Sequence, residues 1–429
     1  MGVPYLEALR GLSGGRAREA AEGDAVAGVR PAVVAAPSDE EGVAAVLGFA
    51  DREGLKILVR GGGTQLGLGA PPTGGDILLD LGALDRVEEH NPGDLTVSVQ
   101  AGLPLASLQE RLAGAGQWLA LDPALPAAAT VGGVVATNAS GPRRLRYGGV
   151  RDQIIGVRIV RADGTIAKGG GKVVKNVAGF DLPKLFTGSL GTLGVIVSAN
   201  FRLYPLPPAS RTIVVRAPDP APLCDLALRV TASTLVPAAL DVAGPAGGGC
   251  ELAARFETIA EATEEQARAL RDLAGPLAAD ARTLTGDEEA AYWARAASDF
   301  LPPTGEGPDG AALLLKASVL PTGVAGWLGA MLDITSSAAL AARWRAHAGH
   351  GLVAVRLTGA ADVLAEAVGP LRRAALDRQG SLVVADAPPA LARRVDVWGP
   401  SPALDLMRRV KAAFDPNNTL NPGRFVGGI

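Results

Sequence analysis

Short apolar runs separated by turns rich in glycine and proline are the main pattern of the first 208 residues. Runs of four to ten residues with β-branched side chains and alternating polarity are typical of β-strands. Apolar residues at helical spacing follow Ser38, with Glu41 completing a capping box, and predict a helix there. Strands are predicted at 31–37, 55–59, 76–81, 95–100, 153–161 and 195–204, and a second helix at 105–112.

The pattern changes after the proline cluster at 205–208. Two sets of strands and helices follow, and their order predicts an α+β domain with an antiparallel sheet and helices on one side. The predicted strands are 212–216, 238–242, 251–257, 312–319, 352–357 and 381–385, and the helical segments are 223–233, 263–273, 324–333 and 363–379.

The chain of 429 residues is too long for one ordinary hydrophobic core, so several domains are expected. We predict an N-terminal segment at 1–30, a first domain at 31–208, a second domain at 209–396, and a C-terminal segment at 397–429 that returns to the first domain. Residues 302–310 are rich in glycine and proline and predict an exposed loop.

Composition excludes several classes of protein. The net charge of −3 comes from 41 basic and 44 acidic residues without long blocks, which does not fit a nucleic-acid-binding surface. The two cysteines provide neither a disulfide framework nor the thiolates of an iron–sulfur cluster. No apolar stretch approaches the roughly 18 residues of a membrane span, so we expect a soluble, cytoplasmic chain that reaches a membrane only through partners.

Three glycine-rich segments carry the candidate chemistry. They lie at 60–69, 130–141 and 188–194, and each adjoins an apolar run. Glycine lets the backbone approach a phosphate, and successive N–H groups in such turns form anion sites. Any one segment could simply form a tight turn, but three indicate a dinucleotide cofactor, and FAD is the best candidate.

The spacing of these glycines excludes two common nucleotide sites. A Rossmann fingerprint starting at Gly61 would require a glycine where Leu66 stands, and the loop runs into Pro71 and Pro72 instead of a helix. A phosphate-binding loop of the Walker type fails at Val173, which follows Lys172. Nicotinamide-dependent dehydrogenases and nucleotide triphosphatases therefore lose most of their support.

Four ordered motifs resemble the vanillyl-alcohol-oxidase or PCMH-type FAD-binding family, in its glycolate oxidase and D-lactate dehydrogenase branch. The motifs are Arg60–Thr64, Thr130–Gly141 followed by Tyr147-Gly148, Lys175–Ile196, and Asp415–Arg424. The resemblance implies an α+β fold: a two-part PCMH-type FAD-binding domain with a ferredoxin-like α+β cap or substrate domain.

The resemblance also implies which residues hold FAD. The first two motifs would contact the pyrophosphate and the flavin. The third motif would contact the adenosine half of FAD, and Asn421 would approach the isoalloxazine ring. The first loop lacks the histidine or cysteine to which some relatives attach flavin, so non-covalent binding is expected. The cofactor residues implied are Arg60, Gly61, Gly62, Gly63, Thr64, Gln65, Leu66, Thr130, Val131, Gly132, Gly133, Thr137, Asn138, Gly141, Gly191, Gly194, Val195, Ile196 and Asn421.

The substrate domain departs from the family pattern. Metal-containing relatives carry His-x-Gly-Asp-Gly-Asn-x-His, but here only His347 and the glycines remain, with His350, Leu352 and Ala354 at the other positions. We therefore expect no metal. His347 or His350 is a candidate base for the substrate hydroxyl, although either could be merely structural. Lys316, within an apolar run, is a candidate clamp for a carboxylate or, alternatively, an edge lysine.

This combination resembles the FAD-binding subunit of bacterial glycolate oxidases. In that group the subunit works beside a homologous catalytic flavoprotein and an iron–sulfur subunit, and the complex oxidises glycolate, a small 2-hydroxy acid, to glyoxylate. The absence of cysteine clusters fits such a division of labour. Two alternatives stay open: a standalone FAD-dependent dehydrogenase of D-2-hydroxy acids of the D-lactate type, and a non-catalytic FAD-binding subunit that stabilises a complex.

Overall fold

The computed structural model describes residues 3–173, 179–244, 249–298 and 311–429, which form two compact units. The first unit comprises Met1–Ser140, Gly149–Leu206 and Pro400–Ile429, and the second comprises Gly141–Gly148 and Pro207–Gly399. The predicted loop at 302–310 and residues 175–178 of the third family motif lie outside the described residues.

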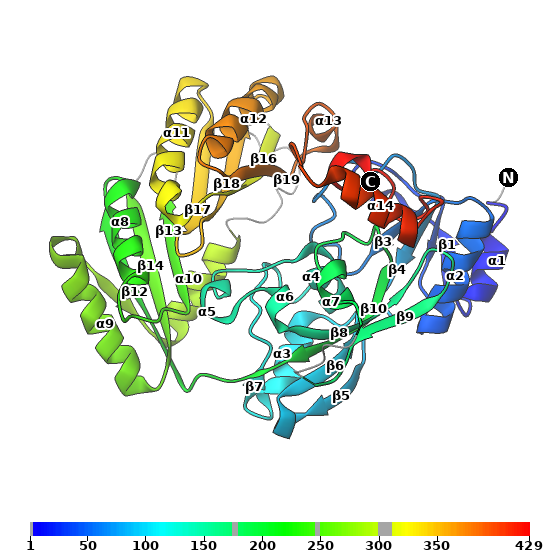
Figure 1. Cartoon of the computed structure of the whole chain (residues 1–429), viewed down its shortest axis with the longest axis horizontal. Helices are drawn as coiled ribbons and strands as arrows, with labels where there is room; N and C mark the ends of the chain where they lie inside the picture. Colours follow the sequence, from blue (N-terminus) through cyan, green and yellow to red (C-terminus); the bar gives the residue numbers. More distant parts are fainter. Residues whose placement is uncertain (1–2, 174–178, 245–248, 299–310) are drawn as a thin grey trace. The chain divides into compact units, whose positions relative to one another are not determined.

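The first unit contains two main sheets (Figure 1). A four-stranded sheet has the order β1-β2-β4-β3, in which β4 runs parallel to both β2 and β3. A five-stranded antiparallel sheet has the order β5-β6-β10-β8-β9. The strands are β1 (Ala17–Glu19), β2 (Val33–Ala35), β3 (Ile57–Arg60), β4 (Ile77–Asp80), β5 (Val87–Asn91), β6 (Thr96–Gln100), β8 (Ile154–Val160), β9 (Ile166–Gly170) and β10 (Val195–Arg202), with the short pair β7 (Gln117–Trp118) and β11 (Tyr204–Pro205).

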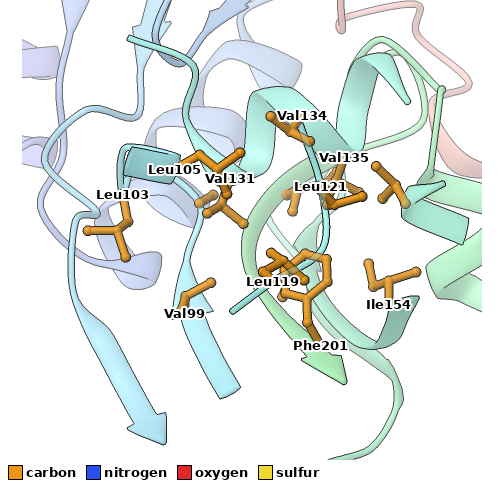
Figure 2. Close-up of a cluster of buried hydrophobic side chains, with 14 of the residues drawn as sticks. Val99, Leu103, Leu105, Leu119, Leu121, Val131, Val134, Val135, Ile154 and Phe201 are labelled. Carbon is orange, nitrogen blue, oxygen red and sulfur yellow. The ribbon is translucent and has the colours of Figure 1, made fainter. Parts of the chain in front are cut away.

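Helices of the first unit cover these sheets and contribute to the core. The described helices are α1 (Leu6–Leu12), α2 (Glu40–Arg52), α3 (Leu105–Ala113), α4 (Val131–Thr137), α6 (Val150–Gln153), α7 (Leu182–Phe186) and α14 (Leu404–Phe414). Figure 2 shows the cluster in which α3 and α4 bury their apolar side chains together with β6, β8 and β10. Val131, Val134 and Val135 of α4 lie in this cluster, so burial of the valines holds in place the glycines between them.

Three local predictions for the first unit differ from the structure. The N-cap of α2 is Asp39, whose carboxylate accepts the N–H of Gly42 at 2.8 Å, and not Ser38. The sequence Asn91-Pro-Gly predicts a turn at His90, but His90 lies in strand β5, and its Nε2 is 3.1 Å from Oε1 of Gln117. Helix α4 was not predicted, because its two glycines mask the apolar spacing of its valines.

The second unit is an eight-stranded antiparallel sheet of order β15-β12-β14-β13-β17-β18-β16-β19. Helices α8, α9, α11 and α12 cover one face (Figure 1). The α+β architecture predicted from the sequence is confirmed. The strands are β12 (Ala209–Ala217), β13 (Ala239–Gly244), β14 (Cys250–Thr258), β15 (Arg282–Leu284), β16 (Ala311–Ser318), β17 (Ala341–His347), β18 (Leu352–Gly359) and β19 (Ser381–Asp386). The helices are α5 (Arg144–Tyr147), α8 (Pro220–Thr231), α9 (Ala260–Ala274), α10 (Gly286–Ser298), α11 (Val324–Ser337), α12 (Ala361–Leu376) and α13 (Pro389–Ala392).

The face of this sheet opposite the four helices carries many polar side chains. Among the described residues, α10 covers one end of this face, and α5 packs against β13, where Tyr147 donates to Glu257 of β14 at 3.2 Å. Trp293 of α10 donates its ring N–H to Thr212 of β12 at 2.9 Å, and Tyr292 donates to Glu251 of β14 at 2.8 Å. We name this the polar face of the second unit. Strand β17, which the sequence did not predict, contributes every second residue to it.

Candidate functional site

A pocket in the first unit is formed by segments far apart in the sequence. They include the loop after β3, the end of β4, α4 with its N-cap Thr130, the segment 190–196, and the C-terminal tail. The lining is Val26, Val59, Gly61, Gly62, Gly63, Thr64, Gln65, Leu66, Leu68, Leu81, Ala101, Thr130, Gly132, Gly133, Ala136, Thr137, Leu190, Gly191, Val195, Ile196, Asn421 and Arg424.

Two glycines of the lining allow this convergence because no side chain fits there. A Cβ atom at Gly62 would lie 1.6 Å from the carbonyl oxygen of Ala128, so the first loop can approach the second segment only without one. Gly191 has φ +68°, a left-handed conformation that other residues rarely adopt, and its Cβ would lie 2.7 Å from Nδ2 of Asn421. The glycines thus set the distance between the walls of the pocket.

Asn421 joins three of the segments. Its Nδ2 donates to the carbonyl of Leu190 at 2.8 Å, its Oδ1 accepts the N–H of Val59 at 3.1 Å, and its own N–H bonds the carbonyl of Ile57 at 2.8 Å. Asn421 has φ +43°, within the left-handed region that asparagine tolerates better than most residues. Its side-chain amide therefore fastens the tail to the end of β3 and to the segment at 190.

Lys411 of α14 connects the C-terminal tail to the segment at 192 through buried hydrogen bonds. Its Nζ donates to Oδ2 of Asp415 at 2.6 Å, to the carbonyl of Thr192 at 2.8 Å and to the carbonyl of Leu420 at 3.1 Å. Burial lowers the pKa of Lys411, while Asp415 acts in the opposite direction. The family motif includes Asp415, but nothing in the sequence pattern indicated that Lys411 is buried with it.

The two arginines nearest the pocket have different roles. Arg60 pairs with Asp80 at 2.7 Å and with Asp24 at 3.1 Å, and its side chain does not line the pocket. Burial raises the pKa of Asp24, but its bonds to Arg18 and Arg60 outweigh burial and hold that pKa far below the usual range. Arg424 lines the pocket, and its Nη2 donates to the carbonyls of Leu66 and Leu68 at 2.7 and 2.5 Å.

The chemistry of the lining fits an anionic ligand with a long, flat, partly apolar body. The residues that the structure places around the pocket include one cationic side chain, Arg424, and no carboxylate. Burial lowers the pKa of Arg424 to about 10, at which the guanidinium is still charged near neutral pH. The glycine-rich walls fit a diphosphate, and Val26, Leu81 and Ile196 provide apolar surface for rings.

Most, but not all, of the predicted cofactor residues line this pocket. Those that do are Gly61, Gly62, Gly63, Thr64, Gln65, Leu66, Thr130, Gly132, Gly133, Thr137, Gly191, Val195, Ile196 and Asn421. The lining does not include Arg60, Val131, Asn138, Gly141 or Gly194. The lining residues that the sequence did not indicate are Val26, Val59, Leu68, Leu81, Ala101, Ala136, Leu190 and Arg424. Leu81 ends a predicted strand and Ala101 directly follows one, and ligand-binding residues often lie at such positions.

The predicted base His347 forms a buried pair on the polar face of the second unit. Its Nδ1 lies 2.7 Å from Oδ1 of Asp241 on the neighbouring strand β13, and Arg345 lies 3.3 Å from Oδ2 of the same carboxylate. Burial alone would raise the pKa of Asp241, but His347 and Arg345 outweigh it and lower that pKa. An ionised Asp241 accepts a hydrogen bond from the Nδ1–H group of His347. The other ring nitrogen, Nε2, is then free to accept a proton.

His350 stacks on His347, with ring centroids 5.6 Å apart and an interplanar angle of 16°. Both of its ring nitrogens are buried, and neither has a hydrogen-bond partner within the described ranges. Burial and the neighbouring His347 lower the pKa of His350 to about 4, so the ring is neutral near pH 7. Among the described residues no group of three histidine, cysteine or carboxylate side chains is placed to hold a metal ion.

Lys316 lies on the same polar face, two strands away from His347. Strand β16 runs between β18 and β19, so Lys316 is not an edge residue, and its side chain is exposed. The register pairs Lys316 with Ala354, and Ala354 with Arg345. At about 4.8 Å between strands and about 3.4 Å per residue, the Cα atoms of Lys316 and His347 lie about 12 Å apart. The structure thus brings both predicted catalytic residues to one surface.

Comparison with known proteins identifies the class that this geometry defines. Residues 31–170 match the FAD binding domain family, and residues 399–425 match the C-terminal domain of FAD linked oxidases. In fold, the chain is similar to p-cresol methylhydroxylase with a TM-score of 0.76 at 17% identity, over 98% of this chain and 95% of that one.

Two curated relatives are subunits of one kind of enzyme. The glycolate oxidase subunit GlcD of Bacillus subtilis is 28% identical over 92% of this chain and 89% of its own length. The glycolate oxidase subunit GlcE of Escherichia coli is 37% identical over 37% of this chain and 45% of its own length. Two segments of the chain thus match domains of FAD-linked oxidases, its fold is similar to that of a PCMH-type flavoprotein, and FAD is its cofactor.

Proposed function

We propose that the chain oxidises a small 2-hydroxy acid as the FAD-binding subunit of a complex of the glycolate oxidase type. In that reaction glycolate becomes glyoxylate, and the electrons pass to an iron–sulfur partner. The observation that carries the proposal is the similarity to GlcD, which extends over 92% of this chain and therefore through both units. A likeness confined to residues 31–170 would support FAD binding alone.

The residues of the pocket would hold FAD without a covalent bond. The loop Gly61–Leu66 and the segment Thr130–Gly133 would bind the pyrophosphate, and the segment 191–196 would bind the adenosine half. When bound, FAD supplies the acceptor for the hydride that leaves carbon 2 of a hydroxy acid. The first loop offers threonine and glutamine where a covalent link would need histidine or cysteine.

On the polar face, His347 would take the proton of the substrate hydroxyl. Its Nδ1 is held by Asp241, as the imidazole of a general base must be oriented by a hydrogen-bond acceptor. Lys316 would bind the substrate carboxylate, since it lies on the same face and has no partner among the described residues, although loss of surrounding water lowers the pKa of its ammonium group.

A specific departure favours a second candidate, a non-catalytic FAD-binding subunit. His350, Leu352 and Ala354 replace the aspartate, asparagine and second histidine of the metal-binding motif that the sequence resembles. A subunit without that motif could bind FAD and either stabilise a complex or relay electrons within it.

The visible spectrum of the purified chain separates these functions. We expect bound yellow flavin, which acid precipitation releases because it is not covalently attached. Anaerobic addition of glycolate or D-lactate should bleach the flavin when the partner subunits are present. Bleaching by the chain alone would instead make it a standalone dehydrogenase, and a flavin that no hydroxy acid reduces in the assembled complex would identify the non-catalytic subunit. Colourless protein that takes up no added FAD would contradict all three.

We also propose that any contact with a membrane goes through the partner subunits. Within the ranges that the structure describes, no helix combines the length and the apolar character that crossing a bilayer would need.

A further inference from the structure

Helix α5 lies beside the turn that follows His347. This turn joins β17 to β18 and carries His350. A Cβ atom added at Gly349 would lie 2.5 Å from Cδ1 and 3.2 Å from Cδ2 of Leu145, so the Leu145 side chain packs directly against the turn. Burial, then His347 and then Arg144 lower the pKa of His350, so the charge of Arg144 on α5 also lies near this ring.

Backbone hydrogen bonds tie the turn to His347 and to the strand that carries its partner. The N–H of Gly351 donates to the carbonyl of His347 at 3.1 Å. The N–H of Ala348 donates at 3.0 Å to the carbonyl of Leu240, the residue before Asp241. Contacts that hold the turn therefore also hold the backbone from which the imidazole of His347 extends.

Buried ion pairs fix α5 on the sheet. Arg143, the N-cap of α5, donates from Nε and Nη2 to Oε1 of Glu257 at 2.9 and 2.7 Å. The hydroxyl of Tyr147 donates to Oε2 at 3.2 Å, and Nε of Arg255 lies 3.1 Å from Oε1. The Glu257 side chain is fully buried, and a buried carboxylate needs such donors. Because these bonds join both ends of α5 to β14, the helix resists displacement from the turn.

We propose that Leu145 and the bonds of α5 to Glu257 position the imidazole of His347 for the proton transfer of the proposed function. The inference rests on that function, since His347 is the proposed base. Leu145 and Tyr147 are positioning residues, because they act on His347 through the turn and through the anchor of the helix. They keep the ring in the orientation in which Nδ1 faces Asp241. A misplacement of about 1 Å can cost on the order of 10²-fold in rate, so a small displacement of the turn is enough.

A double-mutant cycle tests whether Leu145 acts through His347. In the assembled complex, Leu145→Ala should slow the reduction of bound flavin by glycolate about tenfold, with an unchanged KM. The variant with both Leu145→Ala and His347→Asn should be no slower than His347→Asn alone, because no base then remains to be misplaced. Leu332→Ala, at a half-buried leucine of α11, is the matched control and should react as fast as the wild type.

The NMR signals of the histidine rings test the positioning without any hydroxy acid. The full chain loaded with FAD is labelled at its three histidines with ¹⁵N. In the wild type, the Nδ1–H of His347 should give a downfield signal that is protected from exchange by its bond to Asp241. Leu145→Ala and Tyr147→Phe should broaden or shift this signal, while the ring signals of His90 in the first unit stay unchanged.

Three results would overturn the proposal: an unchanged His347 signal in both variants, additive rate losses in the cycle, or an equal loss of rate in Leu332→Ala. If Leu145→Ala does not fold, Tyr147→Phe provides the same two measurements, since it removes only a hydroxyl group. Failure of the proposed function gives a different result. No hydroxy acid would then reduce the flavin of the wild type, but the His347 signal would still change in both variants.

Discussion

The FAD pocket of the first unit consists mainly of backbone and small side chains, whereas the polar face of the second unit depends on long charged side chains. At Gly62 and Gly191 the pocket requires the absence of a side chain. On the polar face, Asp241, His347 and Lys316 would act through their functional groups under the proposed function, and they are placed by the register of adjacent strands. The two regions should therefore respond to mutation in different ways.

Because the two regions are built differently, they should tolerate different amino-acid substitutions. A pocket made by glycine turns loses its shape when a single methyl group is added. A sheet surface keeps its backbone hydrogen bonds when a side chain is exchanged, so a substitution there removes chemistry and spares the fold. Variants of the first unit should thus lose cofactor, and variants of the second should lose activity with the cofactor still bound.

The largest effect on FAD binding is expected for Gly62→Ala. The added Cβ would lie 1.6 Å from the carbonyl oxygen of Ala128, so the loop must move away from the second segment. We expect FAD affinity to fall at least ~100-fold, about 2.7 kcal/mol, measured by titration of the apoprotein with FAD. Gly93→Ala is the matched control, because a Cβ atom there meets nothing within 4 Å. Normal FAD binding by Gly62→Ala would mean that the loop does not form the cofactor site.

Lys411→Met tests whether the tail is held by its buried ion pair. Removing the ammonium leaves Asp415 without its cation and two carbonyls without their donor, and the loss of one partner of a buried pair costs about 3–5 kcal/mol. We expect a lower melting temperature and weaker FAD binding, since the tail carries Asn421 and Arg424. Arg408→Met on the same helix removes an exposed pair and should change neither. An unchanged melting temperature for Lys411→Met would contradict a structural role for this pair.

His347→Asn tests the second region. Loss of a general base lowers the rate of proton transfer by about 10²–10⁴-fold, so flavin reduction by glycolate should slow by that factor while the flavin spectrum stays unchanged. Asp241→Asn should slow the reaction less, because the ring of His347 then loses the carboxylate that orients it but keeps its own Nε2. His90→Asn in β5 is the control and should change the rate less than twofold. Loss of FAD from the His347→Asn variant would contradict the expectation that variants of the second unit keep their cofactor.

The sequence predicted the first region better because glycine motifs are local. The three glycine segments and Asn421 indicated the pocket without any knowledge of the fold, and fourteen of the predicted residues line it. Arg60 shows the limit of such reasoning. It stands inside the motif, but its charge is used by Asp24 and Asp80, which lie 36 and 20 residues away in the sequence.

The second region could be predicted only in part because its contacts are distant in sequence. Asp241 and His347 lie 106 residues apart and meet through the pairing of β13 with β17. Strand β17 reads Ala-Ala-Arg-Trp-Arg-Ala-His, a pattern too short and too polar to indicate a strand by itself. The sequence indicates Lys316 and His347 only by the chemistry of their side chains. The register of the sheet brings them to one face.

The smallest expected effect concerns Asp386, at the end of β19. Burial raises its pKa to about 6, and Arg356 only partly opposes this. The folded state therefore binds the proton more tightly than the unfolded state, so stability should fall as the pH rises from about 4 to about 6 and stay reduced above that.

Asp386→Asn removes this titration and should leave the chain more stable than the wild type at pH 8 and equal to it near pH 4. Because the carboxyl is partly exposed, we expect a gain on the order of 1 kcal/mol. Thermal melts across this pH range measure it, with Asp405→Asn at an exposed position as the control. A variant less stable than the wild type at pH 8 would show that the Asp386 carboxylate instead stabilises the cationic polar face, and charge on that face would then govern fold as well as chemistry.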